Sequence, residues 1–205
     1  MIKEVLKRAD LASEEVDEII IGQVLTAGTG QNPARQAAME AGIPVSKPSH
    51  IVNQVCGSGL RAVISGLQSI KLGESSKVIT GGQESMSITP NLIFNKNLKK
   101  NLENELVDTM VYDGLLDAFN NYHMGVTAEN VAKQFNISRE QQDEFALDSQ
   151  KKTQDAIING RFKNELIEID VNGNSLKEDE HPRNNLTLTD LQKLKTVFME
   201  NGTVT

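Results

Sequence analysis

The segment HIVNQVCGSGLRAVISGLQSIKLGESSKVIT, residues 50–80, contains the pattern that decides the fold. A β-branched run at 50–55 predicts a strand, and the sequence Cys-Gly-Ser-Gly at 56–59 predicts a tight turn. The apolar residues that follow recur at helical spacing until Gly73, and KVIT at 77–80 predicts a second strand. Strand, turn, helix and strand in about thirty residues form a βαβ unit. We therefore expect a parallel sheet with right-handed crossovers.

The sequence before this segment adds elements of the same α/β kind. An apolar stripe at 2–9 predicts a helix, and EIIIGQVL at 18–25 predicts a buried strand because three successive isoleucines suit burial on both faces. Asn32 as N-cap and Pro33 at the first helical position predict a helix that ends at Gly42.

The sequence after this segment is richer in helices. Thr127 is expected to cap a helix over AENVAKQF, and the capping box that begins at Ser138 predicts a helix that runs to Gly160. We therefore expect two domains, an α/β core at 1–85 and a helix-rich part at 86–205.

Three further strand and turn signals lie in the second part. ELIEIDV at 165–171 alternates like a half-buried strand, and Asn172-Gly173 is typical of a hairpin turn. The final residues 203–205 (TVT) predict the start of another strand.

The charge balance excludes several classes of partner. The 205 residues include 21 Lys and Arg against 28 Asp and Glu, which gives a net charge of −7 and a pI near 5.1. Nucleic acids and anionic lipid surfaces are recognised by basic faces, so neither is an expected partner. The one basic cluster, Lys96, Lys99 and Lys100, lies in NKNLKKNLEN, which is typical of a solvated loop.

Composition also indicates the compartment. No apolar run approaches the ~18–20 residues of a membrane span, and the opening MIKEVLKRAD lacks the apolar region of a signal peptide. One cysteine can form neither an internal disulfide nor a cysteine-built zinc site. We expect a soluble, cytoplasmic protein.

Cys56 is the candidate nucleophile. It stands where a parallel strand ends and a helix begins, the edge at which α/β proteins bind ligands. The positive end of the helix dipole and the N–H groups of the turn favour the thiolate, and they could also face a developing oxyanion. The glycines at 57 and 59 leave room for a substrate carbonyl, so a thioester is a natural target. The alternative is that Cys56 is a small buried apolar residue.

Other chemistries fit the sequence less well. Gly57-x-Gly59-x-x-Ala62 satisfies a dinucleotide-binding pattern, but the next strand runs into Gly81-Gly82-Gln83 where that pattern needs an acidic residue, and Glu84 comes too late. A serine nucleophile at Ser58 would need G-x-S-x-G, which Cys-Gly-Ser-Gly does not match.

Metal binding is not expected. The three histidines are far apart in the sequence, and no pair has the spacing of ligands on one helix face. They are His50, His123 and His181.

Eight motifs are spread along the whole chain: GQNPARQAA (30–38), VNQVCGSGLRAV (52–63), GGQESMS (81–87), DGLLDAF (113–119), YHMGVTAENVA (122–132), SREQQDEFAL (138–147), GRFKNELI (160–167) and NGTVT (201–205). Together they resemble the motifs of biosynthetic-type thiolases, the acetyl-CoA acetyltransferases. The resemblance implies a thiolase-like α/β fold, in which the chain corresponds to the first core half with a parallel-rich mixed sheet, followed by the helix-rich loop domain that binds coenzyme A.

The resemblance also implies an activity and roles for five residues. Cys56 matches the nucleophile that takes the acetyl group of acetyl-CoA, after which Claisen condensation gives acetoacetyl-CoA and thiolysis is the reverse. His123 and Met124 match the loop that lines the pantetheine pocket, and Leu115 matches an apolar contact to coenzyme A. Arg183 resembles the arginine near the nucleotide end, which suits an acidic protein with an anionic ligand. No separate cofactor is implied, because the coenzyme A thioester is the substrate, and the family forms homodimers or homotetramers.

The resemblance covers only part of the thiolase pattern. The opening strand and the second half are not matched, and that half carries the G-H-P histidine, the oxyanion asparagine and the second cysteine. Without its base, a helix-end cysteine can react only slowly with an activated acyl donor. Claisen condensation needs a base beside the α-carbon, so we expect this chain alone to be inactive in condensation. We also expect an exposed apolar helix face, an unpaired sheet edge, and aggregation or association. The alternative function is a non-catalytic coenzyme A-binding or assembly module that pairs with a separate second-half chain.

Overall fold

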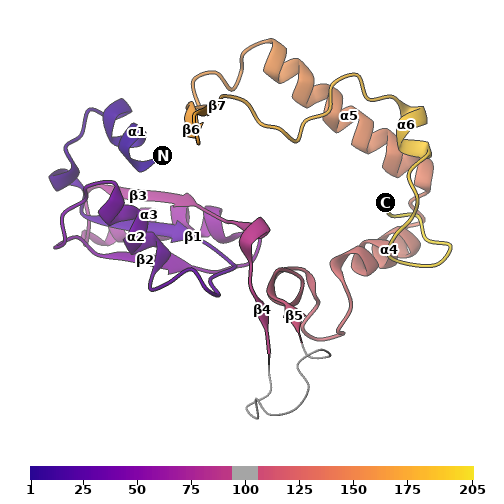
Figure 1. Ribbon diagram of the computed structural model, residues 1–205, viewed down its shortest axis with the longest axis horizontal. Coiled ribbons are helices and arrows are strands. Elements are labelled where there is room, and N and C mark those ends of the chain that lie inside the picture. Colours follow the sequence, from indigo (N-terminus) through magenta and orange to yellow (C-terminus); the bar gives the residue numbers. More distant parts are fainter. Residues whose placement is uncertain (94–105) are drawn as a thin grey trace. The chain divides into compact units, whose positions relative to one another are not determined.

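The computed structural model describes residues 1–93 and 106–205, which form two compact units, Met1–Leu116 and Asp117–Thr205 (Figure 1). The boundary between these units, after Leu116, lies later in the chain than the expected domain boundary between residues 85 and 86. The expected division into a core half and a loop domain stays a prediction. The expected basic loop around Lys99 lies outside the described residues.

A three-stranded parallel sheet forms the centre of the first unit. Strand β1 (Glu18–Gly22) lies between β2 (Ser49–Val52) and β3 (Val78–Gly82), and it runs parallel to both. In this register Gly22 lies opposite both Val52 and Gly82. The carboxyl ends of the three strands therefore meet at one edge, as the βαβ pattern predicted.

Helices cover both faces of this sheet. Helices α1 (Ile2–Arg8) and α2 (Pro33–Glu40) pack on one face, and α3 (Ser58–Leu72) packs on the other, where Gly66 meets Thr80. Burial of β-branched and aliphatic side chains between the strands and the first two helices forms the core. The core residues are Leu6, Val16, Ile19, Ile21, Ala34, Ala38 and Ile43.

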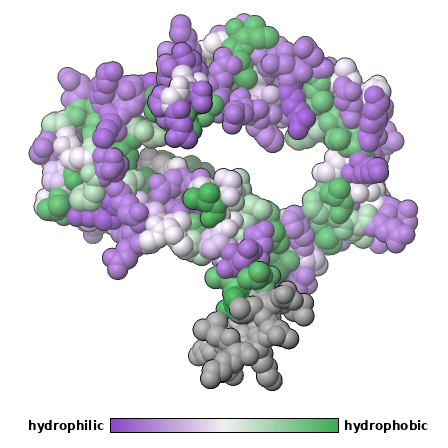
Figure 2. All heavy atoms as spheres, in the orientation of Figure 1, coloured by the Kyte–Doolittle hydropathy of each residue, from purple (hydrophilic) through white to green (hydrophobic). Residues whose placement is uncertain are grey.

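Helix α3 is apolar on its outer side as well. Small residues face the sheet, while six large aliphatic residues of α3 are 39–74% exposed. Five of these aliphatic residues recur at helical spacing and form what we call the outer α3 face: Leu60, Val63, Ile64, Leu67 and Ile70. Figure 2 shows hydrophobic residues at the surface of both units. The outer α3 face is the exposed apolar helix face that the sequence led us to expect.

Short elements complete the first unit. They are the 3-10 helices η1 (Ser13–Glu15) and η2 (Met86–Ile88), the antiparallel pair β4 (Asn91–Leu92) and β5 (Val107–Asp108), and the π-helical turn η4 (Met110–Leu115).

The second unit consists mainly of helices. Its elements are α4 (Met124–Phe135), α5 (Arg139–Ile158), the antiparallel pair β6 (Ile169–Val171) and β7 (Asn174–Leu176), and α6 (Leu188–Gln192). The Ser138–Gln141 capping box is confirmed, as is the turn at Asn172-Gly173, where both residues have positive φ. The predicted start of α4 after Thr127 is wrong, because His123 caps the helix instead.

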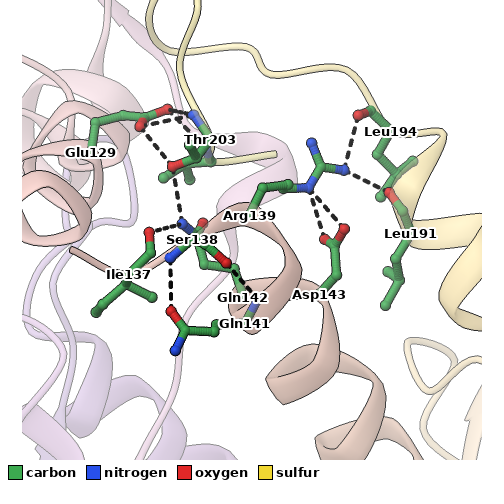
Figure 3. Close-up of polar contacts among 11 residues, drawn as sticks. Glu129, Ile137, Ser138, Arg139, Gln141, Gln142, Asp143, Leu191, Leu194 and Thr203 are labelled. Carbon is green, nitrogen blue, oxygen red and sulfur yellow. Dashed lines mark hydrogen bonds and ion pairs between the residues drawn. The ribbon is translucent and has the colours of Figure 1, made fainter.

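Two side chains hold distant parts of the second unit together (Figure 3). The Arg139 guanidinium contacts the Asp143 carboxylate at 2.9 Å and donates to the carbonyl groups of Leu191 at 2.7 Å and Leu194 at 3.1 Å. Arg139 thereby fixes the C-terminal end of α6 against the start of α5.

The second side chain, Glu129 on α4, is buried and binds the end of the chain (Figure 3). Its carboxylate accepts hydrogen bonds from the N–H groups of Thr203 and Val204 at 2.8 Å and from the Thr203 hydroxyl at 3.1 Å. Burial raises the pKa of Glu129, but these hydrogen bonds outweigh burial and bring the pKa below its ordinary value. Residues 203–205 therefore lie against a carboxylate, and the strand predicted there is not found in the described structure.

Candidate active site

Cys56 lies exposed on a sharp turn between β2 and α3, directly before the Gly57 N-cap. Val55 has a φ of +50°, which a β-branched side chain adopts only under strain. The Ser58 hydroxyl stabilises this turn, because it accepts from the Gln54 N–H at 2.9 Å and donates to the Val55 carbonyl at 2.5 Å. The buried Ser58 side chain thus stabilises the backbone of the turn, and the Cys56 thiol lies exposed to solvent.

The N–H groups that follow Cys56 are already used within the turn. Gly57 N–H donates to the Gln54 carbonyl and Ser58 N–H donates to the Val55 carbonyl, each at 3.0 Å. These two groups are therefore not free to face a developing oxyanion, as we had expected of the turn.

Glycine contacts fix the start of α3 against the strand ends. A Cβ atom on Gly22 would lie 2.4 Å from the Ser58 carbonyl carbon and 2.5 Å from the Gly59 nitrogen, both of them backbone atoms. On the neighbouring strand, a Cβ atom on Gly82 would lie 3.5 Å from the Gly59 Cα. The turn that carries Cys56 therefore rests almost directly on the backbone of β1 and β3.

A polar network that sequence reasoning missed lies at the same edge. The Glu84 carboxylate accepts from the N–H groups of Val24 at 2.9 Å and Leu25 at 3.1 Å. The Gln83 side-chain amide donates to that of Gln23 at 2.8 Å, which in turn donates to the Leu25 carbonyl at 2.9 Å. Glycine followed by glutamine at the ends of both β1 and β3 is the sequence signal that could have indicated this network.

Cys56 lines a pocket of about 430 Å³ within the first unit. Apolar residues form most of its wall, including Leu25, Met110 and the predicted contact residue Leu115. Of the described residues that line it, only Cys56 and Glu84 are titratable, and both Glu84 oxygens accept backbone hydrogen bonds. The structure thus places Cys56 and Leu115 around one cavity, in which no described side chain is an imidazole.

The other predicted site residues belong to the second unit. The Nδ1 atom of His123 accepts from the Gly125 N–H at 3.0 Å, and its ring stacks on Phe198 with centroids 5.0 Å apart. Because Nδ1 is an acceptor here, the neutral ring carries its proton on Nε2. Met124 is 40% exposed, and Arg183 is exposed with its backbone N–H bonded to Gln150. His123 and Met124 are adjacent in the sequence and stand at the start of α4.

The described residues include no helix that could span a membrane. They also contain no group of three His, Cys, Asp or Glu side chains placed to hold a metal ion.

The whole chain, residues 1–205, matches the family model described as thiolase, N-terminal domain. The chain belongs to the thiolase family. It is 49% identical to the acetyl-CoA acetyltransferases of Rhizobium meliloti, over 211 residues, and Shinella zoogloeoides, over 209 residues. It is 48% identical to the cytosolic acetyl-CoA acetyltransferase of Rattus norvegicus, and each alignment covers all of this chain and 53% of the relative.

Solved thiolase structures agree in fold. The acetyl-CoA acetyltransferase of Bacillus anthracis matches 99% of this chain with a TM-score of 0.89 and 35% identity. The Acat5 thiolase from Ascaris suum, solved in complex with coenzyme A, matches 100% of it with a TM-score of 0.91 and 35% identity. The chain covers 52% of each of these structures, so it spans about half the length of its thiolase relatives. The α/β thiolase-like fold of the N-terminal half is confirmed.

Proposed function

We propose that Cys56 accepts the acetyl group of acetyl-CoA as a thioester. The Cys56 thiolate attacks the thioester carbonyl carbon, a new bond forms between Sγ and that carbon, and the bond to the coenzyme A sulfur breaks. The departing coenzyme A thiolate then takes a proton from solvent. The observation that carries the proposal is the exposed Cys56 thiol on a strained turn at the carboxyl edge of a parallel sheet, in a chain of the thiolase family.

For the whole protein we propose acetyl-CoA acetyltransferase activity, that is, Claisen condensation to acetoacetyl-CoA and its reverse. Removing an α-proton from the second acetyl group needs a base in the pocket. The pocket around Cys56 is lined by one described carboxylate, Glu84, which is bonded to two backbone N–H groups. We therefore propose that this chain alone carries out the acyl-transfer half-reaction without condensation.

We assign the substrate contacts as the thiolase resemblance implies. His123 and Met124 line the pantetheine pocket, Leu115 makes an apolar contact to coenzyme A, and Arg183 binds near its nucleotide end. The Nδ1 bond of His123 to Gly125 and its stacking on Phe198 fix the ring and leave the Nε2 proton available to a ligand. In this proposal residues 1–85 form the core half and residues 86–205 form the loop domain that binds coenzyme A.

We also propose a cytoplasmic homo-oligomer. The rat relative is named as cytosolic, which supports the location. The outer α3 face supports association, because large exposed apolar patches mark interaction sites.

The test is to incubate the purified chain with acetyl-CoA and to measure its intact mass. We expect one acetyl group on Cys56, none on a Cys56→Ser variant, and no acetoacetyl-CoA in the same reaction. Coenzyme A binding without any acetyl transfer would overturn the proposed acyl transfer and favour the non-catalytic module that pairs with a second chain. Robust acetoacetyl-CoA formation would overturn the restriction to the half-reaction.

A further inference from the structure

The apolar wall of the pocket beside Cys56 includes a position that has no side chain. Leu25, Met86, Met110 and Leu115 line the pocket, and Gly114 lies among them in η4. The pocket volume, about 430 Å³, is within the ~300–1,000 Å³ of small-molecule sites. This is more room than a two-carbon acyl group needs.

Gly114 is the position where this wall could be thickened without disturbing the fold. A Cβ atom there would lie 3.6 Å from Leu25 Cδ2, an ordinary contact, and beyond its own turn of chain no second atom of the described residues would lie within 4 Å. Gly114 is also absent from the described residues with positive φ, so its backbone suits an L-amino acid. Packing therefore does not require glycine at this position, in contrast to Gly22.

We infer that Gly114 is a specificity-determining residue that sets the length of the acyl chain accepted on Cys56. The inference rests on the proposed acyl transfer to Cys56. A short linear chain such as butyryl extends along Leu25 into the gap at Gly114. The flexible side chains of Met86 and Met110 adapt to its end. A side chain at position 114 fills that gap, so it excludes the longer chain while the acetyl group still fits.

The experiment compares acyl transfer to Cys56 from acetyl-CoA and from butyryl-CoA, followed by intact mass. We expect labelling of the wild-type chain by both thioesters. In Gly114→Val the butyryl-to-acetyl ratio of rates should fall roughly 10-fold or more, as for methylene groups that no longer fit a pocket. Gly114→Ala should give a smaller fall in the same direction, which keeps the test decisive if the valine variant folds poorly.

The matched control is Gly81→Ala, which adds a methyl group in the same unit outside this pocket, where the nearest atom is Ile21 Cδ1 at 4.0 Å. Its ratio should equal that of the wild type. Adding Leu25→Ala to Gly114→Val should restore butyryl transfer, a rescue that a merely structural role of Gly114 would not produce.

The outcomes separate the inference from the proposed function. Acetyl transfer with equal ratios in the wild type and both Gly114 variants would overturn the inference and leave the proposed function standing. No transfer of either acyl group to wild-type Cys56 would overturn the proposed function, and the inference with it.

Discussion

The contact between Gly22 and the start of α3 predicts a large effect of adding one methyl group. In Gly22→Ala the new Cβ atom would lie 2.4 Å from the Ser58 carbonyl carbon, whereas ordinary contacts begin at 3.4 Å. The helix start must therefore move by about 1 Å, since the atoms it meets are backbone and cannot rotate away. Overpacking of this kind costs about 1–3 kcal/mol of unfolding free energy.

The same shift should impair the chemistry of Cys56, which directly precedes this helix. Misplacement of a reacting group by about 1 Å can lower a rate roughly 100-fold. We expect a loss of this size in acetyl transfer from acetyl-CoA to Cys56 in Gly22→Ala, measured by intact mass over time. Urea unfolding followed by circular dichroism gives the free energy.

Gly81→Ala is the matched control, because Gly81 pairs with Ile21 in the adjacent strand and its Cβ atom would meet only Ile21 Cδ1, at 4.0 Å. Its unfolding free energy should change by no more than about 0.5 kcal/mol. If Gly22→Ala and Gly81→Ala have the same unfolding free energy and the same acetyl-transfer rate, the packing argument is refuted.

Three further predictions concern other contacts. Glu129→Gln should lower the unfolding free energy by about 1–3 kcal/mol at neutral pH, since a charged acceptor of several hydrogen bonds is lost. Because the folded-state pKa of Glu129 is lowered, its contribution is present above its ordinary pKa of 4.5 and disappears as the pH falls through the folded value. Urea unfolding should thus show the wild type and Glu129→Gln converging below about pH 4.5. Arg139→Lys should speed amide hydrogen exchange in α6, because lysine cannot bind the Asp143 carboxylate and two carbonyl groups in one plane. The chain should self-associate through the outer α3 face, and Leu60→Lys with Leu67→Lys should lower the mass measured by light scattering.

Each of these predictions has a control. The control for Glu129→Gln is Glu144→Gln, at an exposed position on α5. If the unfolding free energies of the two variants depend on pH in the same way, the stabilising role of the Glu129 carboxylate is contradicted. For Arg139 the control is Arg61→Lys on the exposed side of α3, which should leave exchange in α6 unchanged. For the outer α3 face the control is Gln68→Lys, which adds a charge without removing an apolar side chain. A monomeric wild-type chain would contradict self-association through this face.

Local patterns were sufficient wherever neighbouring residues create the structure. The single strands and helix of the βαβ unit, the Asn32 cap of α2, the Ser138 capping box and the turn at Asn172-Gly173 all depend on residues a few positions apart. The position of Cys56 on a turn between a strand and a helix follows from the same short-range information. Side-chain periodicity and capping are local properties of the chain, so the sequence expresses them directly.

Elsewhere, contacts between distant residues overrode local preference. Thr127 is the better N-cap by residue type, yet α4 begins after His123, whose ring stacks on Phe198 far along the chain. Glycine is required at position 125, because a Cβ atom there would lie 2.2 Å from the Phe198 ring. The cap of α4 was therefore decided by tertiary packing.

The sequence by itself determined that this protein is an α/β member of the thiolase family with a cysteine, the proposed nucleophile, at a strand–helix turn. Only the tertiary structure decided what surrounds that cysteine: the backbone contact at Gly22, the hydrogen bonds from the loop after β1 to the Glu84 carboxylate, and the gap at Gly114. The physical reason is the range of the interactions. Hydrogen bonds within a turn are encoded by adjacent residues, whereas van der Waals contacts and cavities depend on atoms that only the complete fold brings together.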